Sequence, residues 1–118
     1  MDFGFKKLIV WQKAIAYSIK VLKLTESIRK GKGYFKLVEQ VESSADSVPS
    51  NIAEGKGRFS KKEFKHFLYI SRGSLYESVS QLNALNGLGL ISDSNLEELE
   101  KDALEIAAML KGLINSID

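Results

Sequence analysis

Polar side chains that could do chemistry gather in residues 47–77 of this 118-residue chain. Asn51 and Glu54 share one face of a predicted helix, and Glu54 can reach Arg58 one turn further on if the helix continues that far. Such groups either take part in a reaction or fix helix register, because a slip would leave buried polar atoms unpaired. We expect the second role, in a structural polar network of Asn51, Glu54, Arg72 and Ser74.

A glycine-rich turn with many positive charges follows this helix. Gly55 and Gly57 favour a turn at this point, and the free backbone N–H groups at the start of the next helix attract anions. The basic residues of the turn are Lys56, Arg58, Lys61, Lys62 and Lys65. They suit a phosphate or a carboxylate; the alternative is a turn that caps helices and forms ion pairs. The sequence GKGRFS lacks the spacing of a nucleotide-binding P-loop, and no strand precedes it.

A stripe of lysines at heptad spacing (Lys6, Lys13 and Lys20) lies on the first predicted helix. If this stripe and the turn share one side of the molecule, they can bind the phosphates of RNA or DNA without sequence specificity. The alternative is that the lysine stems cover apolar edges while their charged ends stay in water. Aromatic stacking platforms are scarce near the stripe, so we do not expect sequence-specific readout of single strands.

Catalysis and metal binding have few candidate residues. The chain has no Cys and one His, His66, and no close carboxylate cluster has metal-ligand spacing. Glu63 lies three residues before His66, but among lysines this pair is expected to be solvated. No serine nucleophile motif is present. A hydrolase using Glu54, Arg58 and His66 is the least favoured hypothesis, and we expect no enzymatic activity, cofactor, metal or small-molecule substrate.

Apolar residues recur in steps of three and four, which predicts helices over roughly 6–30, 34–55, 60–87 and 94–117. Capping boxes start the last two, with Ser60 and Glu63 in one and Ser94 and Glu97 in the other. The connections are short, so neighbouring helices must run antiparallel. The sequence therefore predicts an all-α, up-down-up-down four-helix bundle that forms a single domain over residues 1–118.

Pro49 lies inside the second predicted helix, where its ring clashes with the carbonyl of Ala45 at a cost of about 3 kcal/mol. Ser47 and Ser50 flank it and could bond the freed carbonyls. We therefore expect a kinked helix with a structural role.

The first helix carries more apolar surface than one side of a bundle needs. Leu8, Trp11, Ile15, Ile19 and Leu22 form one stripe, and a second stripe runs beside it. We expect the excess to be buried against another subunit, with interface residues Trp11, Tyr17, Val21 and Leu24. The alternative is a tightly packed monomer with amphipathic aromatic edges.

Charge is segregated along the chain although the net charge is only +2. Residues 1–36 carry nine Lys/Arg against two acidic residues, and residues 93–118 carry seven acidic residues against two lysines. This pattern can serve partner binding, or subunits that meet basic side to acidic side; the alternative is solvated helix faces that happen to differ in charge. The sequence has no signal-peptide pattern and no apolar run that could span a bilayer, so we expect a cytoplasmic protein without membrane contact.

Several motifs in order along the chain resemble those of the bacterial 23S rRNA intervening-sequence protein family. They are Phe5–Ala14 with its VWQKA run, Ser47–Arg58 with PSNIAEG-x-GR, Glu63–Leu68, and Arg72–Glu77 with its RGSL run. The resemblance implies an antiparallel four-helix bundle that assembles into a ring-shaped homopentamer. It also implies no established enzymatic activity. A related group, the accessory variability determinant proteins of diversity-generating retroelements, forms similar pentamers that associate with nucleic acid and a reverse transcriptase.

One departure from the family pattern affects the candidate site. Family members often carry basic residues shortly after Gln40, whereas this chain has Glu42 and Ser43. The first helix and the 56–65 turn therefore remain the candidates for nucleic-acid binding. Our leading hypothesis is a homo-oligomeric bundle that binds RNA or DNA weakly through a basic face. The rival is a protein–protein scaffold without a nucleic-acid role, in which the acidic fourth helix meets a basic neighbour.

Overall fold

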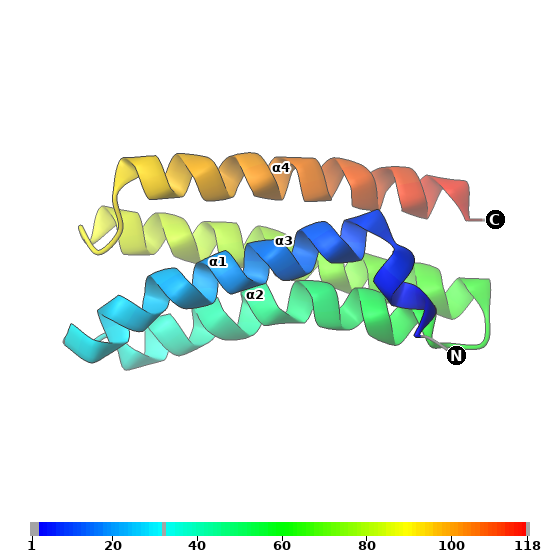
Figure 1. Cartoon of the computed structure of the whole chain (residues 1–118), viewed down its shortest axis with the longest axis horizontal. Coiled ribbons are helices and arrows are strands. Elements are labelled where there is room, and N and C mark those ends of the chain that lie inside the picture. The colour runs from blue at the N-terminus through cyan, green and yellow to red at the C-terminus, as the bar shows by residue number, and fades with distance from the viewer. Residues whose placement is uncertain (1–2, 32, 118) are drawn as a thin grey trace.

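The structure, a computed structural model, describes residues 3–31 and 33–117. Within these ranges it contains a short 3-10 helix, η1 (Gly4–Lys7), and the α-helices α1 (Ile9–Gly31), α2 (Phe35–Lys56), α3 (Lys61–Gly87) and α4 (Asp93–Ser116). Consecutive α-helices run antiparallel, as Figure 1 shows. The all-α fold with four long helices is confirmed, and only the start of α1 differs from its predicted boundary by more than one residue.

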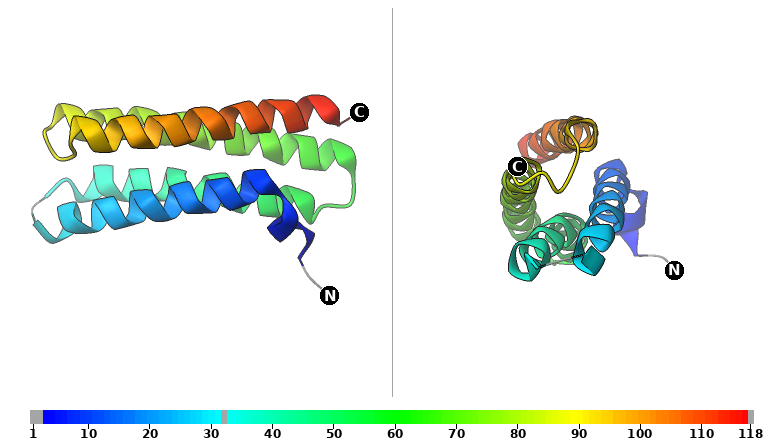
Figure 2. Two further views of the ribbon diagram at one scale, coloured as in Figure 1. Left: turned by 45° about the horizontal axis from the view of Figure 1, so that its top comes forward. Right: turned by 90° about the vertical axis from the view of Figure 1, so that its left-hand side faces the viewer.

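The four α-helices lie at the corners of a square when the bundle is viewed along its axis (Figure 2). Helix α1 contacts α2 and α4 and lies diagonally opposite α3. The start of α1 and the end of α4 lie at the same end of the bundle as the α2–α3 connection (Figure 1). We call this the turn end, because it carries the basic turn predicted from the sequence.

The core consists largely of the positions that the 3–4 spacing predicts. The fully buried side chains include Val41 and Ile52 on α2, Leu75 and Leu82 on α3, and Leu110 on α4. Burial of these apolar side chains holds the helices together.

The ends of two helices depart from the 3–4 apolar spacing. Near the end of α4 the buried residue is Ile114, while Leu113 and Ile117 are only partly buried. Tyr34, the first residue of the second predicted helix, is exposed and precedes α2 in a left-handed conformation with φ of 56°.

The chain before α1 departs from the predicted continuous helix. Leu8 is extended, with ψ of 120°, and separates η1 from α1. The side-chain amide of Gln12 donates a hydrogen bond to the carbonyl of Lys6 at 2.8 Å, and the ring of Phe5 lies 4.9 Å from that of Trp11. These contacts fold η1 back over the first turn of α1.

Only one of the two predicted capping boxes starts its helix. The Ser60 hydroxyl accepts a hydrogen bond from the Glu63 N–H at 3.1 Å and caps α3 as expected. Ser92, rather than Ser94, caps α4 by accepting a bond from the Asn95 N–H at 3.0 Å. The Ser94 prediction was wrong because a serine two residues earlier already satisfies the first free N–H groups.

Helix α2 continues through Pro49, and small side chains let it lie close to α3. The Ser47 hydroxyl lies 2.8 Å from that of Ser74, and the Ser71 hydroxyl donates to the carbonyl of Val48 at 2.8 Å. The sequence predicts that Ser47 bonds a carbonyl freed by Pro49, whereas its hydroxyl bonds across to Ser74 on α3.

The predicted connection at residues 31–33 is described in part. Gly33 has a positive φ of 46°, which suits a glycine in a turn. Lys32, which contributes to the charge of this connection, lies outside the described residues, as do Asp2 and Asp118 from the charge pattern.

Candidate nucleic-acid interface

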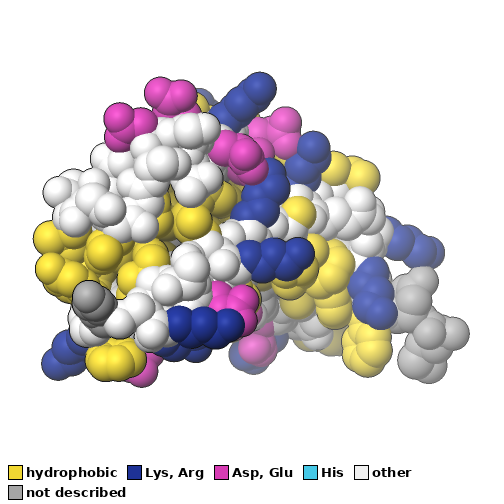
Figure 3. Space-filling model, turned by 60° about the vertical axis from the view of Figure 1, so that its left-hand side comes forward, with side chains coloured by type: hydrophobic (Ala, Val, Ile, Leu, Met, Phe, Trp, Pro, Cys, Tyr) yellow, Lys and Arg dark blue, Asp and Glu magenta, His cyan; other side chains and the backbone are white. Residues whose placement is uncertain are grey.

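Two lysines of the stripe predicted on the first helix form ion pairs with acidic residues of α4. Lys13 Nζ lies 2.8 Å from a carboxylate oxygen of Glu105. Lys20 Nζ lies 2.7 Å from Asp102 and 3.1 Å from Glu98, and these hydrogen bonds raise the pKa of Lys20. Figure 3 shows acidic side chains gathered along the top of the molecule, where α4 lies, with Lys and Arg side chains below them.

These ion pairs offset the charges of Lys13 and Lys20 within the chain. Both side chains remain 44–48% exposed, and their part in binding phosphates stays a prediction. The acidic fourth helix does meet a basic neighbour, but that neighbour is α1 of the same chain.

Lys6 belongs to η1, whereas the other two lysines of the stripe belong to α1. Helix η1 packs on α2, and a Cβ added at Gly4 would lie 3.6 Å from the Lys56 side chain. Lys6 is exposed, and this contact brings its helix next to the basic turn.

Two of the five residues of the basic turn (Lys56, Arg58, Lys61, Lys62 and Lys65) have partners nearby. The Arg58 guanidinium lies 2.8 Å from Glu54 and 3.9 Å from Glu63, and it covers the Phe67 ring at 4.8 Å. Lys56 Nζ lies 5.6 Å from the centre of the Phe64 ring. Arg58 thus lies in the turn beyond α2 and still reaches Glu54.

A close approach of α2 and α3 sets the shape of this turn. A Cβ at Gly55 would lie 2.7 Å from the Phe67 Cβ and 3.2 Å from the Phe64 carbonyl oxygen. Position 55 therefore requires glycine for space. The contact fixes the direction in which α3 starts, and with it the direction of the lysines of its first turns.

The remaining three residues of the basic turn are open to a ligand. Lys61 and Lys62 are exposed and Lys65 is half-buried, and none of the three forms an ion pair in the part of the chain that the structure describes. They follow the Ser60 cap directly, beside the N-terminal end of α3, where the helix dipole also favours negative charge. This group can attract phosphates.

A shallow hollow beside the turn is less suited to an anion. Its lining includes Ser50, Gly57, Arg58 and Glu54. The Glu54 carboxylate balances Arg58 there, so the hollow offers little net positive charge. The predicted anion site is thus confined to the lysines at the start of α3.

The predicted polar network forms in part. The Asn51 side-chain amide donates to the hydroxyl of Ser47 at 2.7 Å and to its carbonyl at 2.8 Å, and Ser47 reaches Ser74. Glu54 instead pairs with Arg58 at the surface, and Arg72 lies over the Tyr76 ring. The network joins α2 to α3 without these two charged residues.

Exposed aromatic residues beside the lysines were missed by the sequence reasoning. Phe59 in the turn is fully exposed, and Tyr69 and Tyr76 on α3 are 51% and 58% exposed. The signal was present, because Tyr69 and Tyr76 lie seven residues apart among basic residues at helical spacing. The expectation that stacking platforms are scarce holds for the stripe on the first helix but not for α3.

The predicted interface residues of the first helix divide between core and surface. Tyr17 is 1% exposed and Val21 is fully buried, whereas Trp11 and Leu24 are partly buried at the edge of the core. The Tyr17 hydroxyl lies 2.8 Å from that of Ser78. Tyr17 and Val21 are therefore removed from the expected subunit interface, because they have no surface left for a partner.

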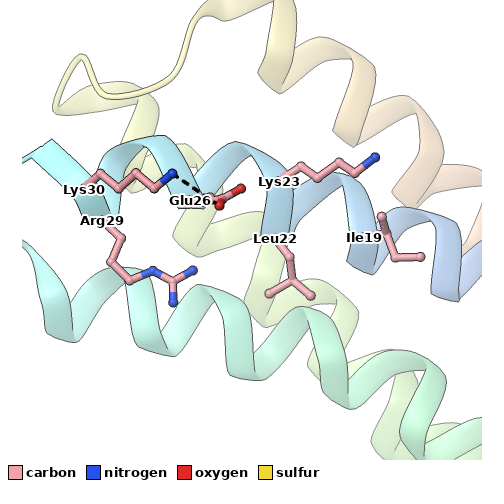
Figure 4. A pocket seen from close by; sticks show the side chains of 6 residues that line it. All are labelled: Ile19, Leu22, Lys23, Glu26, Arg29 and Lys30. Carbon is pink, nitrogen blue, oxygen red and sulfur yellow. Dashed lines mark ion pairs between the residues drawn. The ribbon is translucent and has the colours of Figure 1, made fainter.

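The other apolar stripe of α1 reaches the outside. Ile19 and Leu22 are exposed and line a shallow hollow on the outer side of α1, as Figure 4 shows. Charged side chains border the hollow, among them Lys23, Arg29 and the Glu26–Lys30 pair at 3.5 Å. Since water does not solvate Ile19 and Leu22 favourably, this hollow is the better candidate for contact with another chain.

The structure gives the three residues of the hydrolase hypothesis other contacts. Glu54 and Arg58 pair with each other, and His66 is exposed with its ring 5.6 Å from that of Phe67. Within residues 3–31 and 33–117, no three His, Cys, Asp or Glu side chains are placed to hold a metal ion. No helix of the described chain is long and apolar enough to cross a membrane.

Comparisons with known proteins agree with this architecture. A family model described as 23S rRNA-intervening sequence protein matches residues 6–112. No match was found among curated proteins. One similar crystal structure is that of a protein with unknown function from the S23 ribosomal protein family of Bacteroides thetaiotaomicron VPI-5482. It is 23% identical, with a TM-score of 0.84 over 89% of this chain and 97% of the other. At this identity the likeness concerns the fold.

Proposed function

The chain belongs to the 23S rRNA-intervening sequence protein family, and on this basis we propose that it is a cytoplasmic, non-enzymatic homo-oligomer that binds RNA or DNA through its basic turn. The observation that carries the proposal is the group of Lys61, Lys62 and Lys65 at one end of the bundle, with no ion pair to balance it in the described chain.

The charge at the turn end favours a polyanion. The basic turn has five cationic side chains, and two carboxylates, Glu54 and Glu63, lie among them. A phosphate backbone gains counterion release from each lysine that it contacts, without needing a particular base sequence. The expected binding is therefore weak and non-specific for a single subunit.

Assembly strengthens such binding. The exposed Ile19 and Leu22, with the partly buried Trp11 on the same helix and Leu8 just before it, supply an apolar surface for a second copy. The resemblance of the motifs to the family gives the subunit number as five. A ring of five would present five basic turns, and binding at one turn raises the local concentration of nucleic acid at the others.

A charge-reversal pair tests the proposal. Lys61→Glu with Lys62→Glu should strongly weaken the binding of a labelled RNA, measured by fluorescence anisotropy. The matched control is Lys36→Glu with Lys101→Glu, which makes the same change in net charge at exposed positions away from the turn. Equal binding by both double variants would contradict the proposed site, and absence of binding by the unaltered protein would contradict the function.

The second candidate is a protein–protein scaffold with no nucleic-acid role. An apolar groove between α3 and α4, lined by Val79, Leu104 and Ala107 among others, favours it. The ion pairs of Lys13 and Lys20 count against a scaffold in which α4 meets a basic neighbouring subunit, because they already engage acidic residues of α4 within the chain. Under the scaffold hypothesis, added RNA leaves the elution volume unchanged; under the proposed function, RNA shifts it.

A further inference from the structure

One side of α3 carries alternating basic and aromatic side chains along more than half of its length. These residues follow each other in steps of three and four, so at 3.6 residues per turn they share one side of the helix. We call this surface the α3 outer face: Lys62, Lys65, Tyr69, Arg72 and Tyr76. The buried stripe of α3, with Leu68, Leu75 and Leu82, lies on a different side.

The two tyrosines present ring surface to solvent rather than to the core. Tyr69 is 51% and Tyr76 is 58% exposed. In the described chain neither hydroxyl makes a hydrogen bond, so the polar end of each ring is left to solvent or to a ligand. Their separation of seven residues corresponds to about 10.5 Å along the helix axis.

A cation already lies against one of these rings. The Arg72 guanidinium lies 5.5 Å from the centre of the Tyr76 ring, which is a cation–π distance. Lys65 and Lys62 lie one and two turns before Tyr69 and have no ion pair within the described residues. A planar guanidinium beside an aromatic ring, together with lysines along the same line, can contact both bases and phosphates.

An apolar groove adjoins the far end of this face. It has a volume of about 300 Å³ and is lined on one side by Tyr76 and Val79 and on the other by Leu104 and Ala107. Glu100 also lines it, and its carboxylate accepts a hydrogen bond from Asn83 at 2.9 Å. A flat apolar group against Tyr76 would therefore lose water on both of its sides.

We propose that the α3 outer face is a stacking surface for single-stranded nucleic acid, with Tyr69 and Tyr76 holding bases while Lys62, Lys65 and Arg72 hold the adjoining phosphates. This inference rests on the proposed function and specifies its ligand. Single strands fit because their bases can leave the stack and lie on aromatic rings, whereas a duplex hides the faces of its bases. The fully exposed Phe59, in the turn before α3, extends the same kind of surface beyond the helix.

Alanine and phenylalanine variants separate stacking from charge. In anisotropy titrations with a single-stranded oligonucleotide, Tyr69→Ala and Tyr76→Ala should each weaken binding about fivefold or more, as expected for loss of one stacked base. Tyr69→Phe and Tyr76→Phe keep the rings and should bind like the unaltered protein. Phe35→Ala, which removes an exposed ring at the start of α2, is the matched control and should have no effect.

Three further measurements distinguish the stacking role from a general loss of affinity. The tyrosine variants should keep the slope of log affinity against log salt, while Lys62→Ala with Lys65→Ala should reduce it by about 0.7 for each lost phosphate contact. An oligonucleotide with abasic positions should bind the unaltered protein and the alanine variants equally well. A duplex of the same length should bind more weakly than the single strand.

Three experimental results would each contradict a different part of the proposal. If the unaltered protein binds RNA in a salt-dependent way and the Tyr69→Ala and Tyr76→Ala variants bind equally well, the stacking surface is wrong and the basic turn stands. If instead these variants dissociate an oligomer in the absence of RNA, the face is a contact between protein subunits and the inference is overturned. If no nucleic acid binds the unaltered protein at any salt concentration, both the inference and the proposed function fail.

Discussion

The hydroxyl groups of Tyr17 on α1 and Ser78 on α3 lie 2.8 Å apart inside the core and join the two diagonal helices of the bundle. Burial raises the pKa of Tyr17 from 10.0 to about 12, although the hydrogen bond to Ser78 lowers it somewhat. The Ser78 hydroxyl also lies within 2.7 Å of the Leu75 carbonyl, so the pair is anchored to the backbone of α3.

This pair predicts a loss of stability at alkaline pH. The folded protein holds the Tyr17 proton more tightly than the unfolded chain, so the contribution is complete below pH 10 and disappears as the pH rises towards 12. At 1.36 kcal/mol for each pKa unit, the two-unit difference corresponds to about 2–3 kcal/mol. Urea unfolding of Tyr17→Phe between pH 9 and 12 should show a smaller pH-dependent loss than the unaltered protein. Identical pH profiles would contradict this assignment.

Gly55 should tolerate no side chain without loss of stability. Gly55→Ala places a methyl group 2.7 Å from the Phe67 Cβ, and such overpacking costs about 1–3 kcal/mol. Gly112→Ala on α4 is the control, because no atom lies within 4 Å of its added Cβ. That change should stabilise the protein by up to about 1 kcal/mol through helix propensity. Both effects can be measured as shifts of the urea midpoint, and a neutral Gly55→Ala would mean that α2 and α3 separate at little cost.

Reversing the charges of Lys13 and Lys20 should affect folding more than RNA binding. Lys13→Glu with Lys20→Glu breaks the ion pairs to Glu105, Asp102 and Glu98 and adds repulsion. Since exposed pairs contribute little each, the loss should be on the order of 1 kcal/mol. RNA affinity should fall less than in the Lys61→Glu, Lys62→Glu variant, measured in the same buffer. If the Lys13→Glu, Lys20→Glu variant lost more RNA affinity than the Lys61→Glu, Lys62→Glu variant, the binding surface would be the lysine stripe on the first helix.

The outer stripe of α1 should control assembly. Ile19→Lys with Leu22→Lys places charges at the centre of the exposed apolar hollow and should give a 13.1 kDa monomer in sedimentation analysis, with its helical content unchanged. Leu104→Lys, an equally apolar and more exposed position on α4, is the comparison. If Leu104→Lys dissociates the oligomer and the α1 variant does not, the interface lies at the α3–α4 groove.

The core and the helix ends could be predicted from the sequence because both depend on local spacing. Val41, Ala45, Val48 and Ile52 recur in steps of three and four, and a helix with this spacing must bury that side. The Ser60 cap is local in the same way, since its partner lies three residues away.

The surface could not be predicted equally well, because it depends on contacts between distant residues. Two apolar stripes on α1 are visible in the sequence, yet spacing alone cannot show that the stripe with Tyr17 and Val21 faces the core. The pairing of Lys20 with Asp102 depends on how α1 and α4 lie side by side, 82 residues apart in sequence. The run from Lys62 to Tyr76 was visible, but it becomes a surface only once the other side of α3 is known to be buried.

The most direct test is the affinity of the unaltered protein for single-stranded RNA across a range of salt concentrations, measured by fluorescence anisotropy. We predict a linear fall of log affinity with log salt, with a slope that corresponds to about 0.7 for each phosphate contacted. In the Lys61→Glu, Lys62→Glu variant the slope should be smaller. Binding that does not respond to salt, or no binding at low salt, would contradict the account.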